Sequence, residues 1–301
     1  MTKKQLNPIF NLEGFERKPR FINGFYNKDI LSVSQFTKDS LDYIFGRAGE
    51  MMEMVKKWGT CDLLKGYTLA CVFYEPSTRT SSSFIAAMER LGGKVIPITE
   101  GIQYSSVSKG ESLIDSMITL EQYCDVIVLR HPQIGSSAMA AKHVNVPIIN
   151  AGDGAGEHPT QALLDLFTIK NELGCIDGLR VAMVGDLRYG RTVHSLTQLL
   201  SQYDVSLRYV SPETLRLPME LMNMLIDKGI DVRESHKIED VIETADVLYV
   251  TRIQKERFPD ITQYEEVKNF FVVDEDLLKK AKEKMIVMHP LPRVNELDYR
   301  V

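Results

Sequence analysis

The strongest constraint on the fold of this chain is the alternation of short, nearly all-apolar runs with segments of helical periodicity. Such runs predict strands buried on both faces, and helices between them then cover those faces. The predicted strands are Tyr67–Phe73, Lys94–Ile98, Val126–Leu129, Pro147–Ile149, Val181–Val184, Ser206–Val210, Val247–Val250 and Met285–Met288. The pattern therefore predicts an α/β fold built from parallel sheets.

Helical periodicity is clearest in residues 38–57, where Leu41, Phe45 and Met52 belong to an apolar set spaced three or four apart. Similar patterns occupy Thr160–Leu173 and Thr192–Tyr203. Gly174 directly follows the first of these two, and a glycine in that place is typical of a helix end. We therefore expect helices between most of the predicted strands.

The length of 301 residues indicates about two domains, at ~150 residues for each. Two sheets of four or five strands fit this length better than a single sheet of eight, although the single sheet stays open. The helical pattern that begins near Thr160 is the predicted crossover between the domains. We expect domains at residues 1–159 and 160–301, each a parallel β-sheet flanked by helices.

Composition excludes several classes of protein. The chain is 44% hydrophobic and 26% charged, which is ordinary for a soluble globular protein and excludes intrinsic disorder. No apolar run approaches the ~18 residues that a membrane span needs. A net charge of −5 argues against a general nucleic-acid surface. With four cysteines in no CxxC pair and no visible secretory signal, we expect reduced thiols and a cytoplasmic location.

Polar or Gly/Pro-rich stretches follow six of the predicted strands, and four of them place an arginine within their first few residues past the strand or at the next helix start. They cover residues 74–80, 130–132, 150–161, 185–192, 251–254 and 289–293. Ligands of open α/β sheets bind outside the carboxyl ends of the strands. Arginine suits carboxylate and phosphate because its planar guanidinium donates two parallel hydrogen bonds. The arrangement predicts a site for small anions.

The strongest single element is Ser77-Thr78-Arg79-Thr80, which precedes a predicted helix. Hydroxyls, backbone N–H groups and the helix dipole together favour an anion at a helix start, and Arg79 adds a full positive charge. The alternative is a helix-capping hydroxyl without a ligand. Capping would explain one hydroxyl, but it would not explain Arg79 among three hydroxyl-bearing neighbours.

Two further motifs each have alternatives. Residues 185–192, GDLRYGRT, match the spacing of a nucleotide-binding P-loop, but Arg191 replaces its lysine, which argues against a nucleotide hydrolase. His158 comes just before a helix with Gln161 one turn on, so it is either a structural histidine or a ligand contact. The six histidines are scattered and no metal-binding or serine-nucleophile motif occurs, so no metal or other cofactor is expected.

Taken together, these motifs resemble the aspartate carbamoyltransferase family from about residue 30 to the end. The resemblance rests, in chain order, on EPSTRT (75–80), KGES (109–112), LRHPQ (129–133), NAGDGAGEHPTQALLD (150–165), GDLRYGRTVHSL (185–196), TRIQKERF (251–258) and MHPLPR (288–293). The related ornithine enzymes are expected to show HCLP and SMG motifs. Here position 290 is proline and SMG is absent, which favours the aspartate branch.

The resemblance implies transfer of a carbamoyl group from carbamoyl phosphate to L-aspartate, a step of pyrimidine biosynthesis. It implies that residues 1–159 bind carbamoyl phosphate and residues 160–301 bind aspartate. The implied carbamoyl phosphate residues are Ser77, Thr78, Arg79, Thr80, Ser105, Arg130, His158, Gln161, Leu291 and Pro292. The implied aspartate residues are Lys109, Arg191, Arg252 and Gln254. Those assigned to catalysis are Arg79, Thr80, Lys109 and His158.

In this family Ser105 and Lys109 reach into the neighbouring subunit's site, so the resemblance implies a homotrimer with shared sites. A larger multienzyme or regulatory assembly is also compatible with it, and neither nucleic acid nor membrane is an expected partner. The run Ser81-Ser82-Ser83 is similar to eukaryotic members, including those in multifunctional pyrimidine proteins. The family pattern continues with an interdomain helix that is not found before Val301, so we expect the sequence to be truncated.

Two alternatives remain open. One is a non-catalytic phosphate-binding homologue that serves as a scaffold subunit. The other is a carbamoyltransferase that acts on ornithine or another acceptor.

Overall fold

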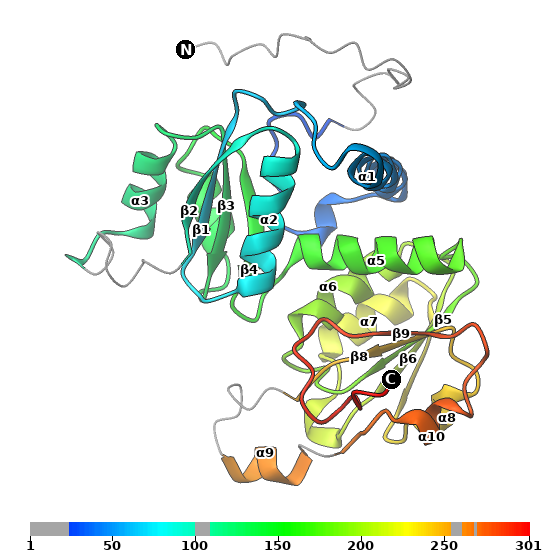
Figure 1. The fold of residues 1–301 in the computed structure, drawn as a ribbon. Helices are drawn as coiled ribbons and strands as arrows, with labels where there is room; N and C mark the ends of the chain where they lie inside the picture. The colour runs from blue at the N-terminus through cyan, green and yellow to red at the C-terminus, as the bar shows by residue number, and fades with distance from the viewer. Residues whose placement is uncertain (1–23, 100–108, 254–260, 268–269) are drawn as a thin grey trace. The chain divides into compact units, whose positions relative to one another are not determined.

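The computed structural model describes residues 24–99, 109–253, 261–267 and 270–301. Two compact units are found among them (Figure 1). The first comprises residues 24–29, the described part of 39–128, and 140–149. The second comprises residues 30–38 and 129–139 together with the described residues from 150 to 301. Each unit contributes most of one sheet.

The first sheet has four strands in the order β2-β1-β3-β4, and β1 pairs with β2 in parallel. Its strands are β1 (Thr68–Phe73), β2 (Lys94–Ile98), β3 (Val126–His131) and β4 (Ile148–Asp153). The helices of this part of the chain are α1 (Lys38–Trp58), α2 (Thr78–Arg90), α3 (Leu113–Leu120) and α4 (Ser136–Ala141). Helix α2 packs against both β1 and β2 (Figure 1), which fixes its first residues close to the end of β1.

The second sheet has five parallel strands in the order β7-β6-β5-β8-β9. Its strands are β5 (Arg180–Val184), β6 (Ser206–Val210), β7 (Asp231–Ser235), β8 (Val247–Val250) and β9 (Ile286–Met288). The helical elements of this part are η1 (Val33–Gln35), α5 (Pro159–Leu173), α6 (Arg191–Leu200), η4 (Glu213–Leu215), α7 (Met219–Asp227), α8 (Glu239–Ile242), α9 (Ile261–Val267) and α10 (Glu275–Leu278).

Both faces of the second sheet are covered because successive side chains of a strand point in opposite directions. On one face, Val184 and Val250 pack in a buried cluster with residues of α8 and α10. On the other face, Tyr209 of β6 hydrogen-bonds Thr197 of α6, and Tyr249 of β8 hydrogen-bonds Asp165 of α5. The nearly all-apolar character of these strands follows from this burial on two sides.

The predicted α/β architecture with two parallel sheets is confirmed, and the alternative of one eight-stranded sheet is wrong. All eight predicted strands are present, and α1 extends one residue beyond its predicted range. Gly174 ends α5 in the left-handed conformation, as its place after the helix predicted. Helix α6 begins one residue earlier and ends three residues earlier than predicted.

Two differences from the predicted strands bear on the site. Strand β7 was missed because it lies at the edge of its sheet, where Asp231, Arg233 and Glu234 need not be apolar. Strands β3 and β4 run further than their apolar residues, through His131 and Asp153. These polar residues therefore end strands instead of beginning loops.

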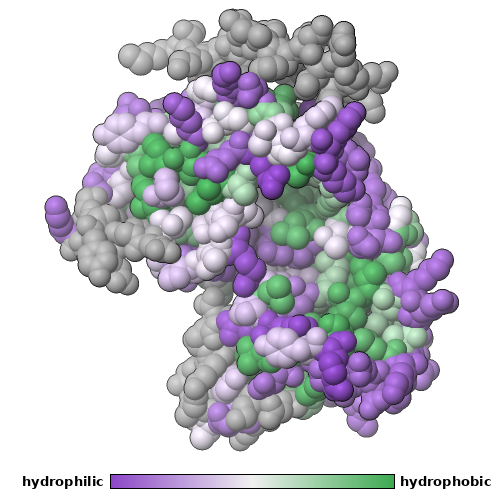
Figure 2. Space-filling view, viewed as in Figure 1, coloured by the Kyte–Doolittle hydropathy of each residue, from purple (hydrophilic) through white to green (hydrophobic). Residues whose placement is uncertain are grey.

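Surface character is mixed. On the face drawn in Figure 2, hydrophilic residues surround smaller hydrophobic areas. Among the described residues, no helix is both long enough and apolar enough to cross a membrane.

The order of strands reverses once in each sheet, between β1 and β3 in the first and between β5 and β8 in the second. Such reversals leave a crevice at the carboxyl ends of the strands, and this is where α/β proteins bind ligands. The loop after β5 begins with Gly185, and the segment after β8 begins with Thr251. These two segments touch: an ideal Cβ on Gly185 would lie 2.1 Å from the carbonyl oxygen of Thr251.

We expect Gly185→Ala to lower the free energy of unfolding by ~3 kcal/mol or more, because a methyl group must displace the Thr251 backbone at a φ of +121°. Gly229→Ala is the matched control. Gly229 has a φ of +72° with open space around it, so only the ~1 kcal/mol cost of the left-handed backbone applies there. Urea unfolding of both variants measures the difference, and equal losses would contradict the close approach.

Candidate functional site

In the first unit, the Ser77–Thr80 segment forms the start of α2, which runs for 13 residues. Ser77 occupies the capping position, but its side chain makes no capping hydrogen bond. The first backbone N–H groups of any helix have no partner within the helix. Thr78 and Arg79 are exposed, so a hydroxyl and a guanidinium are available beside those N–H groups. This arrangement suits an anion and is not explained by capping with the Ser77 hydroxyl.

Lys109 is exposed and is followed by Gly110 and helix α3. The hydroxyl of Ser112 caps α3 by accepting a hydrogen bond from the backbone N–H of Asp115 at 3.1 Å. Lys109 is thus tied to a capped helix three residues away. The predicted site residues Ser105 and Gln254 lie outside the described residues.

In the second unit, Asp153 organises the glycine-rich loop that leads to α5. Its Oδ1 accepts from the backbone N–H of Glu157 at 2.7 Å, and its Oδ2 accepts from that of Gly135 at 2.8 Å. The backbone N–H of Gly154 donates to the carbonyl of His131 at 2.9 Å. Asp153 therefore joins the loop after β4 to the segment after β3. Sequence reasoning did not single it out, although a carboxylate within GDGAG is a signal of such a turn.

Glu157 holds the same loop from the other side. Its Oε1 accepts from the hydroxyl of Ser32 at 2.6 Å, and its Oε2 accepts from the backbone N–H of Val33 at 2.7 Å. Both partners belong to the start of η1. Glu157 directly precedes His158, so the backbone of His158 is anchored on one side by this contact. Sequence reasoning missed Glu157 because its partners lie more than 120 residues earlier.

His158 is the most electrostatically perturbed of the predicted residues. It is 5% exposed, and its pKa is lowered to about 3 by burial, by Arg191 and by Arg130, in that order. The second unit thus brings three predicted residues together. At neutral pH the imidazole carries no charge and can donate one hydrogen bond without adding a proton to the site.

Arg191 begins α6 and lies against the glycine-rich loop. Its Nη1 donates to the carbonyl of Gly154 at 2.6 Å. An ideal Cβ on Gly152, whose φ is +117°, would lie 3.1 Å from the guanidinium carbon. Gly152 therefore allows the arginine to approach the backbone closely. A guanidinium is also a group that suits a carboxylate, because it donates a parallel pair of hydrogen bonds.

The loop from Gly185 to Arg191 is braced by its neighbours. Asp186 accepts from the backbone N–H of Tyr189 at 2.9 Å, and its own N–H donates to the hydroxyl of Thr251 at 3.1 Å. The N–H of Leu187 donates to the carbonyl of Leu215 in η4 at 3.2 Å. The loop after β5 is therefore held to the segments that follow β6 and β8.

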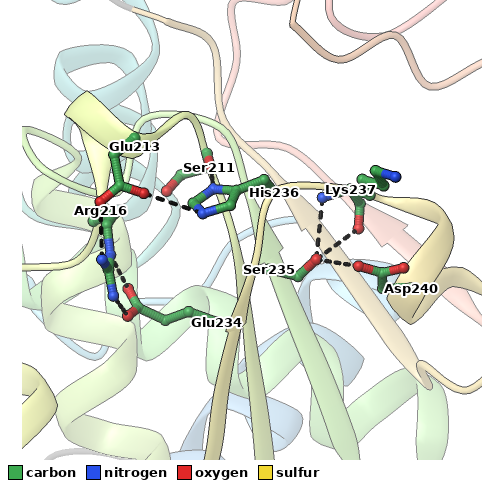
Figure 3. Close-up of polar contacts among 8 residues, drawn as sticks. All are labelled: Ser211, Glu213, Arg216, Glu234, Ser235, His236, Lys237 and Asp240. Carbon is green, nitrogen blue, oxygen red and sulfur yellow. Dashed lines mark hydrogen bonds and ion pairs between the residues drawn. The ribbon is translucent and has the colours of Figure 1, made fainter.

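Charged and polar side chains connect the η4 segment with β7 (Figure 3). They are Glu213, Arg216, Glu234 and His236. Glu213 pairs with Arg216 at 3.0 Å and with Nε2 of His236 at 3.1 Å. Arg216 also pairs with Glu234, and Nδ1 of His236 donates to the carbonyl of Ser211 at 2.9 Å. These pairs are exposed, so each contributes little stability and the cluster serves mainly to orient the segment.

The segment after β9 contains the predicted residues Leu291 and Pro292. Nδ1 of His289 accepts from the backbone N–H of Leu291 at 2.8 Å, so Nε2 carries the hydrogen that goes to Glu296 at 2.9 Å. Burial would raise the pKa of Glu296, but hydrogen bonds from His289 and the backbone outweigh it and lower that pKa. Leu291 thus has a fixed backbone, whereas its side chain is 47% exposed.

Gln161 and Arg252 complete the predicted set in the second unit. Gln161 lies in the first turn of α5 and donates from Nε2 to Asp165 at 2.9 Å. Arg252 is half-buried and follows the end of β8 by two residues. Within the described part of the chain, no group of three or more His, Cys, Asp or Glu side chains is arranged to hold a metal ion.

Sequence comparisons match two adjoining domains. A profile of the aspartate/ornithine carbamoyltransferase carbamoyl-phosphate-binding domain matches residues 28–171, and one of the aspartate/ornithine-binding domain matches residues 177–301. The multifunctional protein pyr1-3 of Dictyostelium discoideum is 53% identical over 279 residues, which are 93% of this chain but 12% of that protein. The aspartate carbamoyltransferase catalytic subunit of Thermococcus onnurineus is 50% identical over 90% of this chain and 87% of its own.

Solved structures give the same result. The catalytic subunit of M. jannaschii aspartate transcarbamoylase matches with a TM-score of 0.84 and 49% identity, over 91% of this chain and 89% of that one. Aspartate transcarbamoylase from Trypanosoma cruzi, in complex with N-(phosphonacetyl)-L-aspartic acid, matches with a TM-score of 0.83 and 41% identity. That match covers 91% of this chain and 86% of the other.

The electrostatics of His158 generate a prediction. We expect its imidazole resonances to stay constant from about pH 8 to about pH 5, because burial and two arginines lower its pKa to about 3. Two-dimensional NMR of the histidine side chains measures this, with His158→Gln identifying the signal. The urea-unfolded chain is the control, in which the same side chain should titrate near pH 6.5. A folded-state midpoint near 6.5 would show that His158 is not buried between the arginines.

Proposed function

This chain belongs to the aspartate/ornithine carbamoyltransferase family, and we propose that it transfers the carbamoyl group of carbamoyl phosphate to the α-amino group of L-aspartate. The products are N-carbamoyl-L-aspartate and phosphate, which places the reaction in pyrimidine biosynthesis. The observation that carries the proposal is the neutral, buried His158 beside Arg130 and Arg191. The two arginines can bind an anion, and the neutral imidazole can donate a hydrogen bond to it without a change of protonation.

In this proposal, carbamoyl phosphate is bound by the residues that the family resemblance assigns to it. The phosphate lies on the start of α2, where Ser77, Thr78, Arg79 and Thr80 supply donors and positive charge, with Ser105 also assigned to it. Arg130, His158 and Gln161 are also assigned to carbamoyl phosphate. The absence of a capping hydrogen bond from the Ser77 side chain to α2 supports this assignment. The carbonyl groups of Leu291 and Pro292 accept hydrogen bonds from the carbamoyl amide.

Aspartate binds through Arg191 and Arg252, one for each carboxylate, with Gln254 and Lys109 as further contacts. Two arginines match a substrate that has two carboxylates, because each guanidinium can donate a parallel pair of hydrogen bonds. The position of Arg191, against the loop that leads to His158, supports this assignment. Aspartate bound there would have its α-amino group close to the carbamoyl carbon that it attacks.

The reaction needs no protein nucleophile. The α-amino group attacks the carbamoyl carbon, a tetrahedral intermediate forms, and the C–O bond to phosphate breaks. Arg79, Thr80 and His158 donate to the carbonyl oxygen as it gains negative charge. The amine proton passes to the departing phosphate. The protein contributes positioning and a preorganised electrostatic environment.

We further propose a homotrimer in which Ser105 and Lys109 act in the neighbouring subunit's site. The exposed side chains of Ile118 and Tyr123, at 40% and 62%, support an interface on the first unit beside α3. Incorporation into a larger multienzyme or regulatory assembly, a cytoplasmic location, and a division of roles at residues 1–159 and 160–301 belong to the same proposal. Neither nucleic acid nor membrane is a proposed partner.

Arg79→Ala should lower kcat/KM for carbamoyl phosphate by at least ~10²-fold, because the variant loses a charged donor from both the phosphate site and the transition state. A colorimetric assay for carbamoyl-aspartate measures this, with ornithine as the control acceptor and Arg90→Ala as the control variant. Arg90 ends the same helix, so its loss should leave turnover unchanged. Turnover on ornithine would point to another carbamoyltransferase. Binding of phosphate without turnover on either acceptor would point to a scaffold homologue.

Subunit mixing tests the shared site. Arg79→Ala and Lys109→Ala chains should each be inactive, but mixed trimers should recover activity, since some sites then receive an intact arginine and an intact lysine. Activity is measured after the two chains are dissociated and reassembled together. The control is each variant reassembled alone. Mixed trimers without activity would rule out sharing of Lys109 between subunits.

A further inference from the structure

Asp165 is a buried carboxylate that the proposed reaction does not use. It lies on α5, one turn after Gln161, and is 4% exposed. Nε2 of Gln161 donates to its Oδ1 at 2.9 Å, and the hydroxyl of Tyr249 donates to its Oδ2 at 2.8 Å. Each carboxylate oxygen therefore receives one hydrogen bond from a side chain of the second unit.

We propose that Asp165, held by Tyr249, is a positioning residue that fixes the amide of Gln161 and so makes the site selective for a carbamoyl group. The inference rests on the proposed function, since Gln161 acts there as a ligand contact. Asp165 itself touches no substrate in this scheme and acts only through Gln161.

The selectivity follows from donor and acceptor chemistry. An ionised carboxylate only accepts hydrogen bonds, so the NH₂ end of the Gln161 amide must face Asp165. The oxygen Oε1 is then the end that remains for a ligand. A carbamoyl amide donates hydrogen bonds, whereas phosphate oxygens mainly accept them. A fixed Oε1 therefore accepts a hydrogen bond from the carbamoyl amide of the substrate. It contributes no favourable hydrogen bond to phosphate alone.

Tyr249 fixes the carboxylate in its turn. Its ring is fully buried in β8, and its hydroxyl also interacts with Thr192, the neighbour of Arg191 at the start of α6. Tyr249 lies three residues before Arg252 in the chain. The Gln161–Asp165–Tyr249–Thr192 network thus links α5, which carries Gln161, with α6, which begins at Arg191, and with β8, which precedes Arg252.

The network reduces stability at neutral pH. Burial raises the pKa of Asp165 to about 6, and the hydrogen bonds from Tyr249 and Gln161 only partly oppose this. The folded state therefore holds a proton on Asp165 that the unfolded chain releases at lower pH, so stability falls as pH rises through about 6. A residue with only a structural role would be expected to add stability.

The groups that face Asp165 do not titrate in this range. On its own helix it faces the neutral amide of Gln161, and His158 at the helix start is uncharged because its pKa is about 3. From β8 it faces Tyr249, whose pKa is raised well above 10 by burial and by Asp165. From α6 the network includes Thr192, which has no ionisable group.

The test compares two probes on the full chain by isothermal titration calorimetry at about pH 8. Phosphonoacetamide, a hydrolysis-resistant compound with an amide and a phosphonate, stands in for carbamoyl phosphate, and inorganic phosphate lacks the amide. Asp165→Asn and Tyr249→Phe should each weaken phosphonoacetamide binding on the order of tenfold. Phosphate affinity should change by less than about twofold.

Tyr209→Phe is the matched control. Its hydroxyl is equally buried and bonds Thr197 at 2.8 Å on the same face of the sheet, but this pair lies outside the network. Both probes should bind this variant as they bind the wild type. In thermal unfolding, the melting temperature of Asp165→Asn relative to wild type should be higher at about pH 8 than at about pH 5, because only the wild type ionises there.

Equal losses for both probes, or no loss for phosphonoacetamide, would overturn the positioning role. If Asp165→Asn does not fold, the conservative Tyr249→Phe variant decides by the same criteria. A wild type that binds phosphonoacetamide but makes no carbamoyl-aspartate would refute the proposed function while leaving the selectivity of Asp165 to be measured. A wild type that binds neither probe would overturn both.

Discussion

The reversal of strand order in each sheet is the constraint on which the remaining features depend. In both sheets the chain leaves the first strand towards one edge and later returns to its other side. The helices that connect neighbouring strands therefore diverge at this point, and the carboxyl ends of two adjacent strands are left open. Arg79 follows β1 and Arg130 is the last residue but one of β3, while Arg191 and Arg252 follow β5 and β8. The topology thus places an arginine at or after the carboxyl end of each of these four strands.

Two buried ionisable groups lower the free energy of unfolding, one of them as pH falls and the other as pH rises. The His158 side chain is neutral in the folded state. As pH falls below about 6.5, the unfolded chain binds a proton on this side chain, whereas the folded state binds it only near pH 3, so the folded state loses stability. Asp165 has the opposite dependence, since stability is lost as pH rises through about 6. Both losses come from burying an ionisable group beside the site. The two-sided apolar core of the second sheet has to offset them.

Most of the fold could be predicted because a central strand that is buried on both faces is nearly all apolar in sequence. Strand β7 lacks this apolar pattern, since an edge strand with one open side tolerates Asp231 and Glu234. The places of Arg79, Arg130, Arg191 and Arg252 relative to the strands could also be predicted from the sequence, whereas their contacts with a ligand stay a proposal. The carboxylates Asp153, Glu157 and Asp165 could not, because their roles depend on partners that only folding brings near. Glu157, for example, meets Ser32 across 125 residues.

These three carboxylates reconcile the acidic composition of the chain with a site for anions. A net charge of −5 would repel the proposed anionic substrates if carboxylates faced them. In the described structure, both oxygens of Asp153, Glu157 and Asp165 accept hydrogen bonds from backbone or side-chain donors of the protein. Carboxylates that accept hydrogen bonds in this way orient the loop, the helix start and Gln161. The negative residues thus fix the loops around the proposed site, and the arginines supply its positive charge.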